Sequence, residues 1–226
     1  MNQAQVSVIQ NTPTMPMIRA LGGVGLICAL FISLTYQFTL PIIEKKKAIY
    51  LQEAVYRTIP GAVASKTFVI NADHQIVPPE GVSDPLQVFY AGYDEQGHLA
   101  GLALEARGLG FQDVIVLLYG YQPETQTLIG FQVLESKETP GLGDKIEKEP
   151  FINNIKGLDV SLNEAGAIAH PIELVAPGSK NQNWQIDSIS GATITSKAIG
   201  KMLLQHSSQW IPILHRQRLV YQEQTP

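Results

Sequence analysis

Residues 187–196 of the chain read Asp-Ser-Ile-Ser-Gly-Ala-Thr-Ile-Thr-Ser, a segment rich in hydroxyl groups that directly precedes an apolar run at residues 197–204. The apolar run predicts a helix, and the free N–H groups and dipole of a helix N-terminus favour a phosphate. Gly191 lets the backbone take a positive φ or approach a ligand closely. The segment therefore predicts a phosphate site with a hydroxyl close enough to form an ester. An ordinary N-cap and turn would use the same residue types.

The segment resembles the acceptor motif Asp-x-x-Ser-Gly-Ala-Thr of proteins that carry FMN bound covalently through its phosphate. These proteins are the FMN-binding subunits of the Rnf electron-transport complex and of the Na⁺-translocating NADH:quinone reductase. The match is complete, at Asp187, Ser190, Gly191, Ala192 and Thr193. The resemblance implies that Thr193 holds the flavin phosphate and that a separate flavin transferase makes the ester from FAD.

A second loop, at residues 138–143, reads Glu-Thr-Pro-Gly-Leu-Gly and follows a predicted strand. Its glycines let the backbone reach a flat ligand and its leucine offers an apolar surface, although Pro-Gly is also a common turn pair. The same family has this loop packed against the isoalloxazine ring. The resemblance thus implies cofactor contacts at Glu138, Thr139, Gly141, Leu142 and Gly143, and Lys145 is a further candidate for tuning the flavin.

The N-terminal part of the chain has no charged residue between Ala20 and Ile43. A bilayer core of about 30 Å needs about 20 apolar residues in a helix, and the aromatic residues that follow are typical of a membrane interface. A cleavage site for a signal peptide is not evident. We therefore expect a cytoplasmic tail at residues 1–17, a transmembrane helix at 18–43 and an FMN-binding domain at 44–226. A buried core helix and a cleaved signal peptide are the alternatives.

The orientation of this span is ambiguous. Arg19 precedes the apolar stretch and three lysines, at residues 45–47, follow it. The positive-inside rule would place the large domain in the cytoplasm. The resemblance implies the opposite, a single-pass protein of the bacterial inner membrane with its FMN domain on the periplasmic side, and we follow the resemblance.

The rest of the chain alternates short runs of β-branched and aromatic residues with turn residues. This pattern predicts an α+β fold with a mainly antiparallel sheet flanked by helices. The predicted strands lie at residues 88–91, 99–106, 113–119, 128–134 and 172–175. Helical structure is expected at residues 44–59, ended by Pro60 and Gly61, at 165–169, at 197–204, and as a short helix or tail at 210–221.

Composition excludes several functions. The formal net charge is −4 and the sequence shows no basic patch or arginine stripe, so nucleic acid is not an expected partner. Cys28 is the single cysteine, which excludes an intrachain disulfide and a cysteine-based metal or iron–sulfur site. No Gly-x-Gly-x-x-Gly unit is present, so we do not expect NADH to be oxidised on this chain.

Together these features predict a membrane-anchored electron-transfer subunit of an Rnf-type ion-translocating ferredoxin:NAD⁺ oxidoreductase. One spanning helix cannot form an ion path, so ion translocation is expected in other membrane subunits, with no turnover chemistry on this chain alone. The short chain favours the G subunit of Rnf over the C subunit of the quinone reductase. From another class, a membrane-tethered, non-redox binding module for an anionic ligand would share the same loops.

Overall fold

The computed structural model describes residues 14–222. The chain forms two compact units, Met1–Ile49 and Tyr50–Pro226. The part of the predicted N-terminal tail at residues 1–13 lies outside the described residues.

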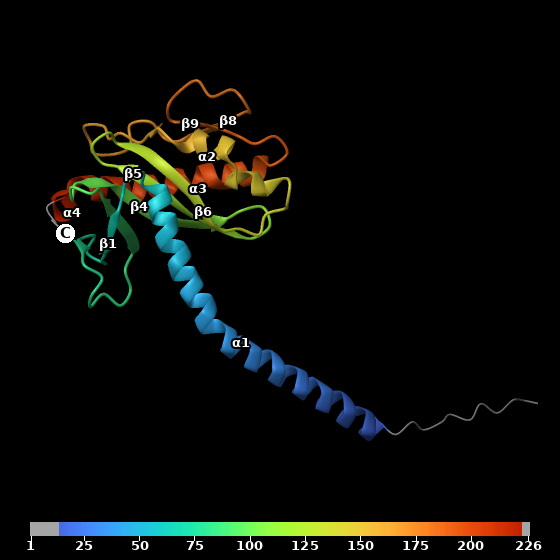
Figure 1. The fold of residues 1–226 in the computed structure, drawn as a ribbon. Coiled ribbons are helices and arrows are strands. Elements are labelled where there is room, and N and C mark those ends of the chain that lie inside the picture. Colours follow the sequence, from blue (N-terminus) through green and yellow to red (C-terminus); the bar gives the residue numbers. More distant parts are fainter. Residues whose placement is uncertain (1–13, 223–226) are drawn as a thin grey trace, which may run out of the picture. The chain divides into compact units, whose positions relative to one another are not determined.

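The first unit contains most of helix α1, which runs from Thr14 to Thr58 (Figure 1). Its apolar part is long and apolar enough to cross a membrane, and its large side chains are exposed there. The helices predicted at 18–43 and 44–59 are thus one continuous helix, which also includes residues 14–17 of the predicted tail. Pro41 lies inside the helix, where its ring removes one backbone hydrogen bond.

The second unit contains a seven-stranded sheet in which every neighbouring pair is antiparallel, in the order β2-β1-β3-β4-β5-β6-β7. The predicted α+β class and its antiparallel sheet are confirmed. The four central predicted strands are present as β3, β4, β5 and β6, whereas the sequence pattern did not single out β1, β2 and β7. The strands are β1 Ala64–Ile70, β2 Ile76–Val77, β3 Gln87–Tyr93, β4 Leu99–Leu109, β5 Val114–Gln122, β6 Thr127–Glu135 and β7 Leu158–Asp159.

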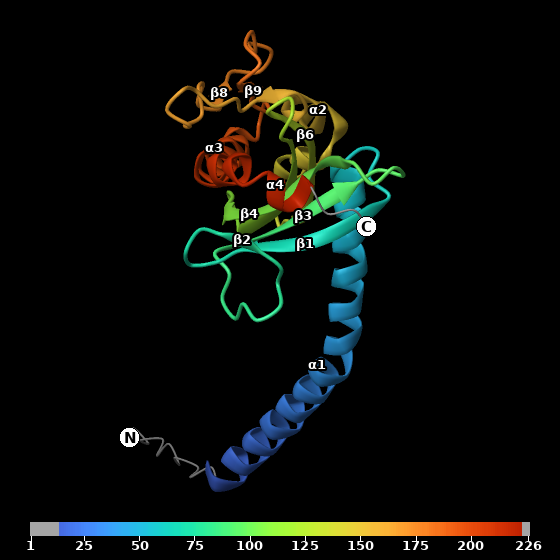
Figure 2. The same ribbon diagram turned by 90° about the vertical axis from the view of Figure 1, so that its left-hand side faces the viewer.

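One face of the sheet carries the main core of the second unit. Helix α3 (Thr193–Arg216) packs on this face, together with α2 (Glu149–Ile155) and α4 (Leu219–Gln222) (Figures 1 and 2). Alternation along β5 points Leu117 and Tyr119 into this core with Ile199 and Leu203 of α3. Residues 187–192 therefore lead directly into a helix that packs on this core.

The opposite face of the sheet packs against the end of α1. Ala54, Val55 and Ile59 form a smaller core there with Ala103 and Leu118. Glycines on the strands make room for the helix backbone: a Cβ at Gly120 would lie 2.5 Å from the carbonyl oxygen of Thr58, and one at Gly130 would overlap it. The residues 50–59 thus belong to the fold of the second unit.

Two segments differ from the sequence prediction. Residues 165–169 are not helical, because the Asn163 side chain accepts the backbone N–H groups of Ala165 and Ala167 and Gly166 takes a φ of +76°. Helix α3 begins at Thr193, four residues before the predicted start, and continues through Pro212 to Arg216, so only α4 remains a separate short helix.

Strands β8 (Glu173–Val175) and β9 (Gln185–Asp187) form a small parallel sheet of their own.

Candidate functional site

Thr193 is the first residue of α3, and its side chain is exposed. Ala192 stands at the N-cap position, and no side chain caps this helix end. Gly191 just before it has a φ of +83°, a conformation that favours glycine. The hydroxyl of Thr193 therefore lies beside backbone N–H groups that no capping side chain covers, at the positive end of the helix dipole.

The other two hydroxyls of this helical turn are buried and engaged. Ser196 Oγ donates to the carbonyl oxygen of Ala192 at 2.9 Å and accepts the N–H of Ile189 at 3.0 Å. Thr195 Oγ1 donates to Glu138 Oε2 at 2.6 Å. Both side chains are at most 2% exposed. Within this turn only Thr193 offers an oxygen to an external reactant.

Glu138 joins three segments at the floor of the site. Its Oε1 accepts the backbone N–H groups of Phe111 at 2.8 Å and Gln112 at 3.1 Å, and its Oε2 accepts the Thr195 hydroxyl. The residue is 6% exposed. Both carboxylate oxygens are therefore occupied by the protein, and Glu138 acts as a support that holds the β4–β5 turn against α3.

The 139–143 loop folds over this support. The N–H groups of Leu142 and Asp144 both donate to the carbonyl oxygen of Thr139, whose hydroxyl accepts Gln112 Nε2 at 2.9 Å. Gly141 takes a φ of +77°. A Cβ at Gly143 would come within 2.6 Å of Glu138 Oε2, so only glycine lets the loop lie this close. The loop ends in the 3₁₀ helix η1 (Gly143–Glu147).

The two predicted loops line one cavity of about 380 Å³, within the size range of small-molecule sites. The Leu142 side chain is 46% exposed at this cavity, and a Cβ at Gly191 would contact it at 3.4 Å. The structure therefore brings together most of the predicted site. The cavity is lined by Phe111, Glu138, Thr139, Leu142, Gly143, Gly191, Ala192, Thr193, Ile194 and Thr195.

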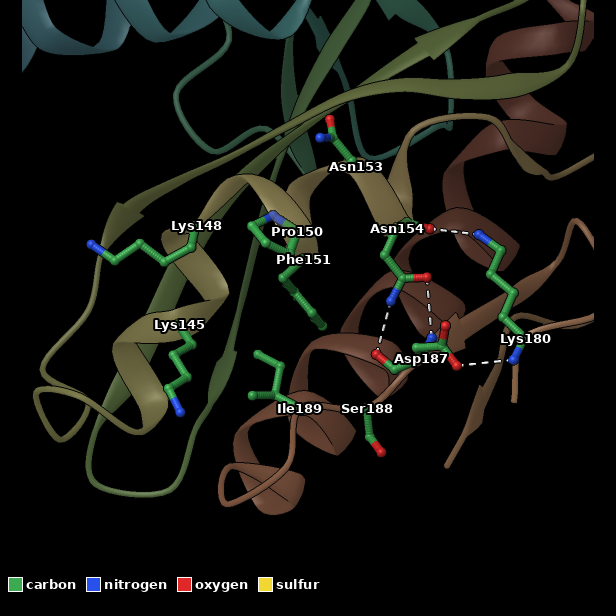
Figure 3. A pocket seen from close by; sticks show the side chains of 10 residues that line it. All are labelled: Lys145, Lys148, Pro150, Phe151, Asn153, Asn154, Lys180, Asp187, Ser188 and Ile189. Atoms are coloured by element: carbon green, nitrogen blue, oxygen red, sulfur yellow. Dashed lines mark hydrogen bonds between the residues drawn. The ribbon is translucent and has the colours of Figure 1, made fainter. Parts of the chain in front are cut away.

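Asp187 supports the acceptor segment from its other side (Figure 3). Its Oδ1 accepts the N–H groups of Ser179 and Lys180, and its backbone forms two hydrogen bonds with the Asn154 side chain. Lys180 Nζ donates to the carbonyl oxygen of Asn154 at 2.7 Å. Burial lowers the pKa of Lys180, and the charge of Asp187 opposes this shift. Asp187 thus fixes the start of the motif.

Four predicted residues, Asp187, Lys145, Ser190 and Gly141, do not line the Thr193 cavity. Asp187 and Lys145 line a second cavity of about 760 Å³, between η1, α2 and the start of the acceptor segment (Figure 3). The Ser190 side chain is exposed in the turn before Gly191. Among the described residues, no group of three or more His, Cys, Asp or Glu side chains could hold a metal ion.

Sequence reasoning missed several residues of the site. Phe111, Thr195 and Asn154 contribute through contacts between segments that are distant in sequence, whereas Ser196 contributes through local hydrogen bonds to Ile189 and Ala192. For Thr195 and Ser196 the sequence did contain a signal. In a helix that starts at Thr193, both side chains lie on the buried face. For Phe111 and Asn154 the sequence alone gives no signal.

The chain is similar to known proteins both in sequence and in fold. Residues 110–205 match the model of the family described as FMN-binding domain. The G subunit of the ion-translocating oxidoreductase complex of Methanosarcina acetivorans is 31% identical over 182 residues, which cover 78% of this chain and 83% of that protein. The chain belongs to the family of these G subunits. Its resemblance to the G subunit of Rnf, drawn from two loops, is thereby confirmed.

Other members of the G-subunit family are more distant. The proteins of Shewanella loihica and Haemophilus influenzae (strain PittEE) are 26% and 29% identical, over 79% of this chain each and over 80% and 81% of their own lengths. Among solved structures, Shewanella oneidensis NqrC superposes with a TM-score of 0.62 at 17% identity, covering 77% of this chain and 99% of that one. The C subunit of the Na⁺-translocating NADH-quinone reductase of Parabacteroides distasonis gives 0.60 at 21% identity, covering 75% and 94%. These two structures show that the fold is shared.

Proposed function

We propose that this chain is the FMN-carrying electron-transfer subunit of a membrane-bound, Rnf-type ion-translocating oxidoreductase, with FMN held by a phosphoester to Thr193. The observation that carries the proposal is the position of Thr193, exposed at an uncapped helix N-terminus in a cavity shared with the 138–143 loop. Membership of the G-subunit family supports the same function.

The residues present fit a flavin phosphate. The N-terminus of α3 offers N–H groups and a positive dipole to the phosphate, and the positive φ of Gly191 lets the preceding backbone turn away. The small side chain of Ala192 leaves space next to Thr193. Leu142 presents an apolar surface in the same cavity, suited to a flat ring system.

Attachment of the flavin requires only an acceptor from this chain. The oxygen of Thr193 attacks the flavin-side phosphorus of FAD, the pyrophosphate bond breaks, AMP leaves, and the hydroxyl proton passes to a base of the flavin transferase. An exposed, unhindered hydroxyl meets this need, whereas Thr195 and Ser196 are buried. Asp187 and Ser196 hold the segment in the shape that presents Thr193.

Bound FMN supplies the electron-transfer chemistry, and the chain supplies position and electrostatics. The helix end orients the phosphate, and the Glu138 support keeps the two loops at a fixed separation. Thr193 is therefore a modified residue and not a turnover nucleophile. We assign no catalytic residue to this chain alone.

Helix α1 serves as a single-pass anchor in the bacterial inner membrane, and we place the second unit on the periplasmic side. A tether keeps the flavin at high effective concentration near the other membrane subunits of the complex, which carry the ion path and the adjacent redox centres. The flavin transferase is a partner during maturation only.

The test uses the full chain expressed in membranes together with its flavin transferase. On a denaturing gel under ultraviolet light, the wild-type band should fluoresce, Thr193→Ala should not, and Thr193→Ser should fluoresce because it keeps the acceptor oxygen. A band that survives Thr193→Ala would move the attachment to another residue. No fluorescence from the wild type would favour the non-redox binding module.

A further inference from the structure

Phe111 is an aromatic residue exposed at the mouth of the Thr193 cavity. It follows the last residues of β4, its side chain is 59% exposed, and it lines the same cavity as Leu142 and Thr193. Apolar side chains of this size are usually buried, and exposed ones that gather around a cavity mark a binding surface. Ile194, also 58% exposed, lies at the same cavity.

The backbone around Phe111 is hydrogen-bonded although its ring is exposed. Its N–H and that of Gln112 donate to Glu138 Oε1, and the N–H of Gly110 donates to the carbonyl oxygen of Asp113 at 2.9 Å. A Cβ at Gly110 would overlap Glu138 Oε1, so the turn fits tightly against this carboxylate. Asp113 is also paired with Lys137 at 2.6 Å. These contacts fix the backbone from which the Phe111 side chain extends.

We propose that Phe111 forms the wall of the flavin site that packs on the isoalloxazine ring, with Glu138 as its positioning residue. This inference rests on the proposed function. Apolar walls from Phe111, Leu142 and Ile194 suit the faces of a flat heteroaromatic ring. The Thr139 side chain and the loop backbone suit its polar edge. Offset aromatic stacking favours such a pair beyond simple burial of apolar area.

The test compares flavinylated full-length chains in detergent. Intact mass first establishes the FMN adduct in the wild type, Phe111→Ala, Phe111→Trp and the control Leu109→Ala, an exposed apolar residue two positions away that does not line the cavity. Quenching of the bound flavin's fluorescence by iodide then reports how well the ring is covered, and the flavin's visible circular dichroism reports its fixed environment.

We expect Phe111→Ala to raise the iodide quenching constant about twofold or more and to weaken the visible dichroism, because one wall of the ring is removed. Phe111→Trp should lower the flavin's fluorescence several-fold, because an indole stacked on the ring quenches it. Leu109→Ala should match the wild type in each measurement.

Two results would overturn the inference while leaving the Thr193 ester intact. In one, both Phe111 variants carry FMN with wild-type quenching and dichroism. In the other, both variants lose the adduct although Leu109→Ala keeps it, which would give Phe111 a role in maturation instead of ring packing. If only Phe111→Ala fails to carry FMN, the flavin fluorescence of Phe111→Trp is the test. A several-fold decrease supports the inference, and wild-type fluorescence overturns it. Absence of the adduct from the wild type would instead contradict the proposed function.

Discussion

At the scale of single residues, the first turn of α3 separates one exposed hydroxyl from two buried ones. Thr195 supports the Glu138 carboxylate and Ser196 closes the 189–192 turn, while Thr193 makes neither contact. We infer that exposure distinguishes Thr193 as the proposed acceptor within the first turn of α3, whereas residue type alone does not, because the sequence offers three hydroxyls within four positions. The contacts that bury the other two come from the helical phase of α3 and from a partner 57 residues away.

This separation predicts different effects of two alanine substitutions on the folded apoprotein. Ser196→Ala leaves the N–H of Ile189 without its acceptor, so the free energy of unfolding should fall by about 1–2 kcal/mol. Thr193→Ala removes an exposed hydroxyl and should change it by less than about 0.5 kcal/mol. Chemical denaturation followed by tryptophan fluorescence measures both. A loss from Thr193→Ala as large as that from Ser196→Ala would show that Thr193 has a structural role.

A half-buried histidine gives the second unit a pH dependence. Tyr119 donates its hydroxyl to His206 Nδ1 at 2.8 Å, and His206 Nε2 donates to Gln87 Oε1 at 3.1 Å. The side-chain nitrogen of Gln87 donates to the carbonyl oxygens of Val88 and Glu105, so its side-chain oxygen is the atom that faces His206. Burial lowers the pKa of His206 from 6.5 to about 4, so the neutral imidazole is the form that fits this network.

Because the pKa of His206 is lower in the folded than in the unfolded chain, the unfolded chain binds more protons between pH 6.5 and 4. The free energy of unfolding should therefore decline as pH falls through this window, by up to about 3 kcal/mol from this group. Denaturation at several pH values should show the slope in the wild type and in His98→Gln, whose ring is exposed, and a reduced slope in His206→Gln. An equal slope in His206→Gln would refute the assignment.

At the scale of elements, runs of β-branched and aromatic residues between turn residues predicted the central antiparallel strands well, because such side chains pack favourably on a pleated sheet. The contact between the end of α1 and the sheet could not be predicted. It depends on glycines from neighbouring strands, Gly92, Gly101, Gly120 and Gly130, whose shared position emerges only when the strands pair. The early start of α3 was missed because its first turn carries polar residues that are typical of caps.

The packing of residues 54–59 on the sheet predicts a strong effect of a side chain at Gly130. The added Cβ of Gly130→Ala would overlap the backbone of Thr58, which cannot move aside as a flexible side chain would. We expect a loss of about 2–4 kcal/mol in the free energy of unfolding. Gly200→Ala is a matched control, since its Cβ would meet Leu174 at an ordinary 3.5 Å inside a helix, and it should be neutral or stabilising by up to about 1 kcal/mol. Equal effects of the two substitutions would argue against this packing.

At the scale of the whole molecule, the chain combines an apolar helix with a flavin-type domain, and the charge rule and the family resemblance disagree on its orientation. The single cysteine allows a direct test. In a Cys28→Ser background, Glu164→Cys places one thiol in the exposed 163–167 turn of the second unit. In sealed spheroplasts a membrane-impermeant maleimide should label it without lysis, with Cys28→Ser alone as the unlabelled control. Labelling only after lysis would place the domain in the cytoplasm.

The central claim is the bond between FMN and one side-chain oxygen at the start of α3. Trypsin should release residues 181–197 as one peptide from a chain made in a host that contains the flavin transferase. Tandem mass spectrometry is predicted to find this peptide heavier by FMN less one water, with the added mass on Thr193 and not on Thr195 or Ser196. The unmodified peptide mass, or the added group on another residue, would contradict the account.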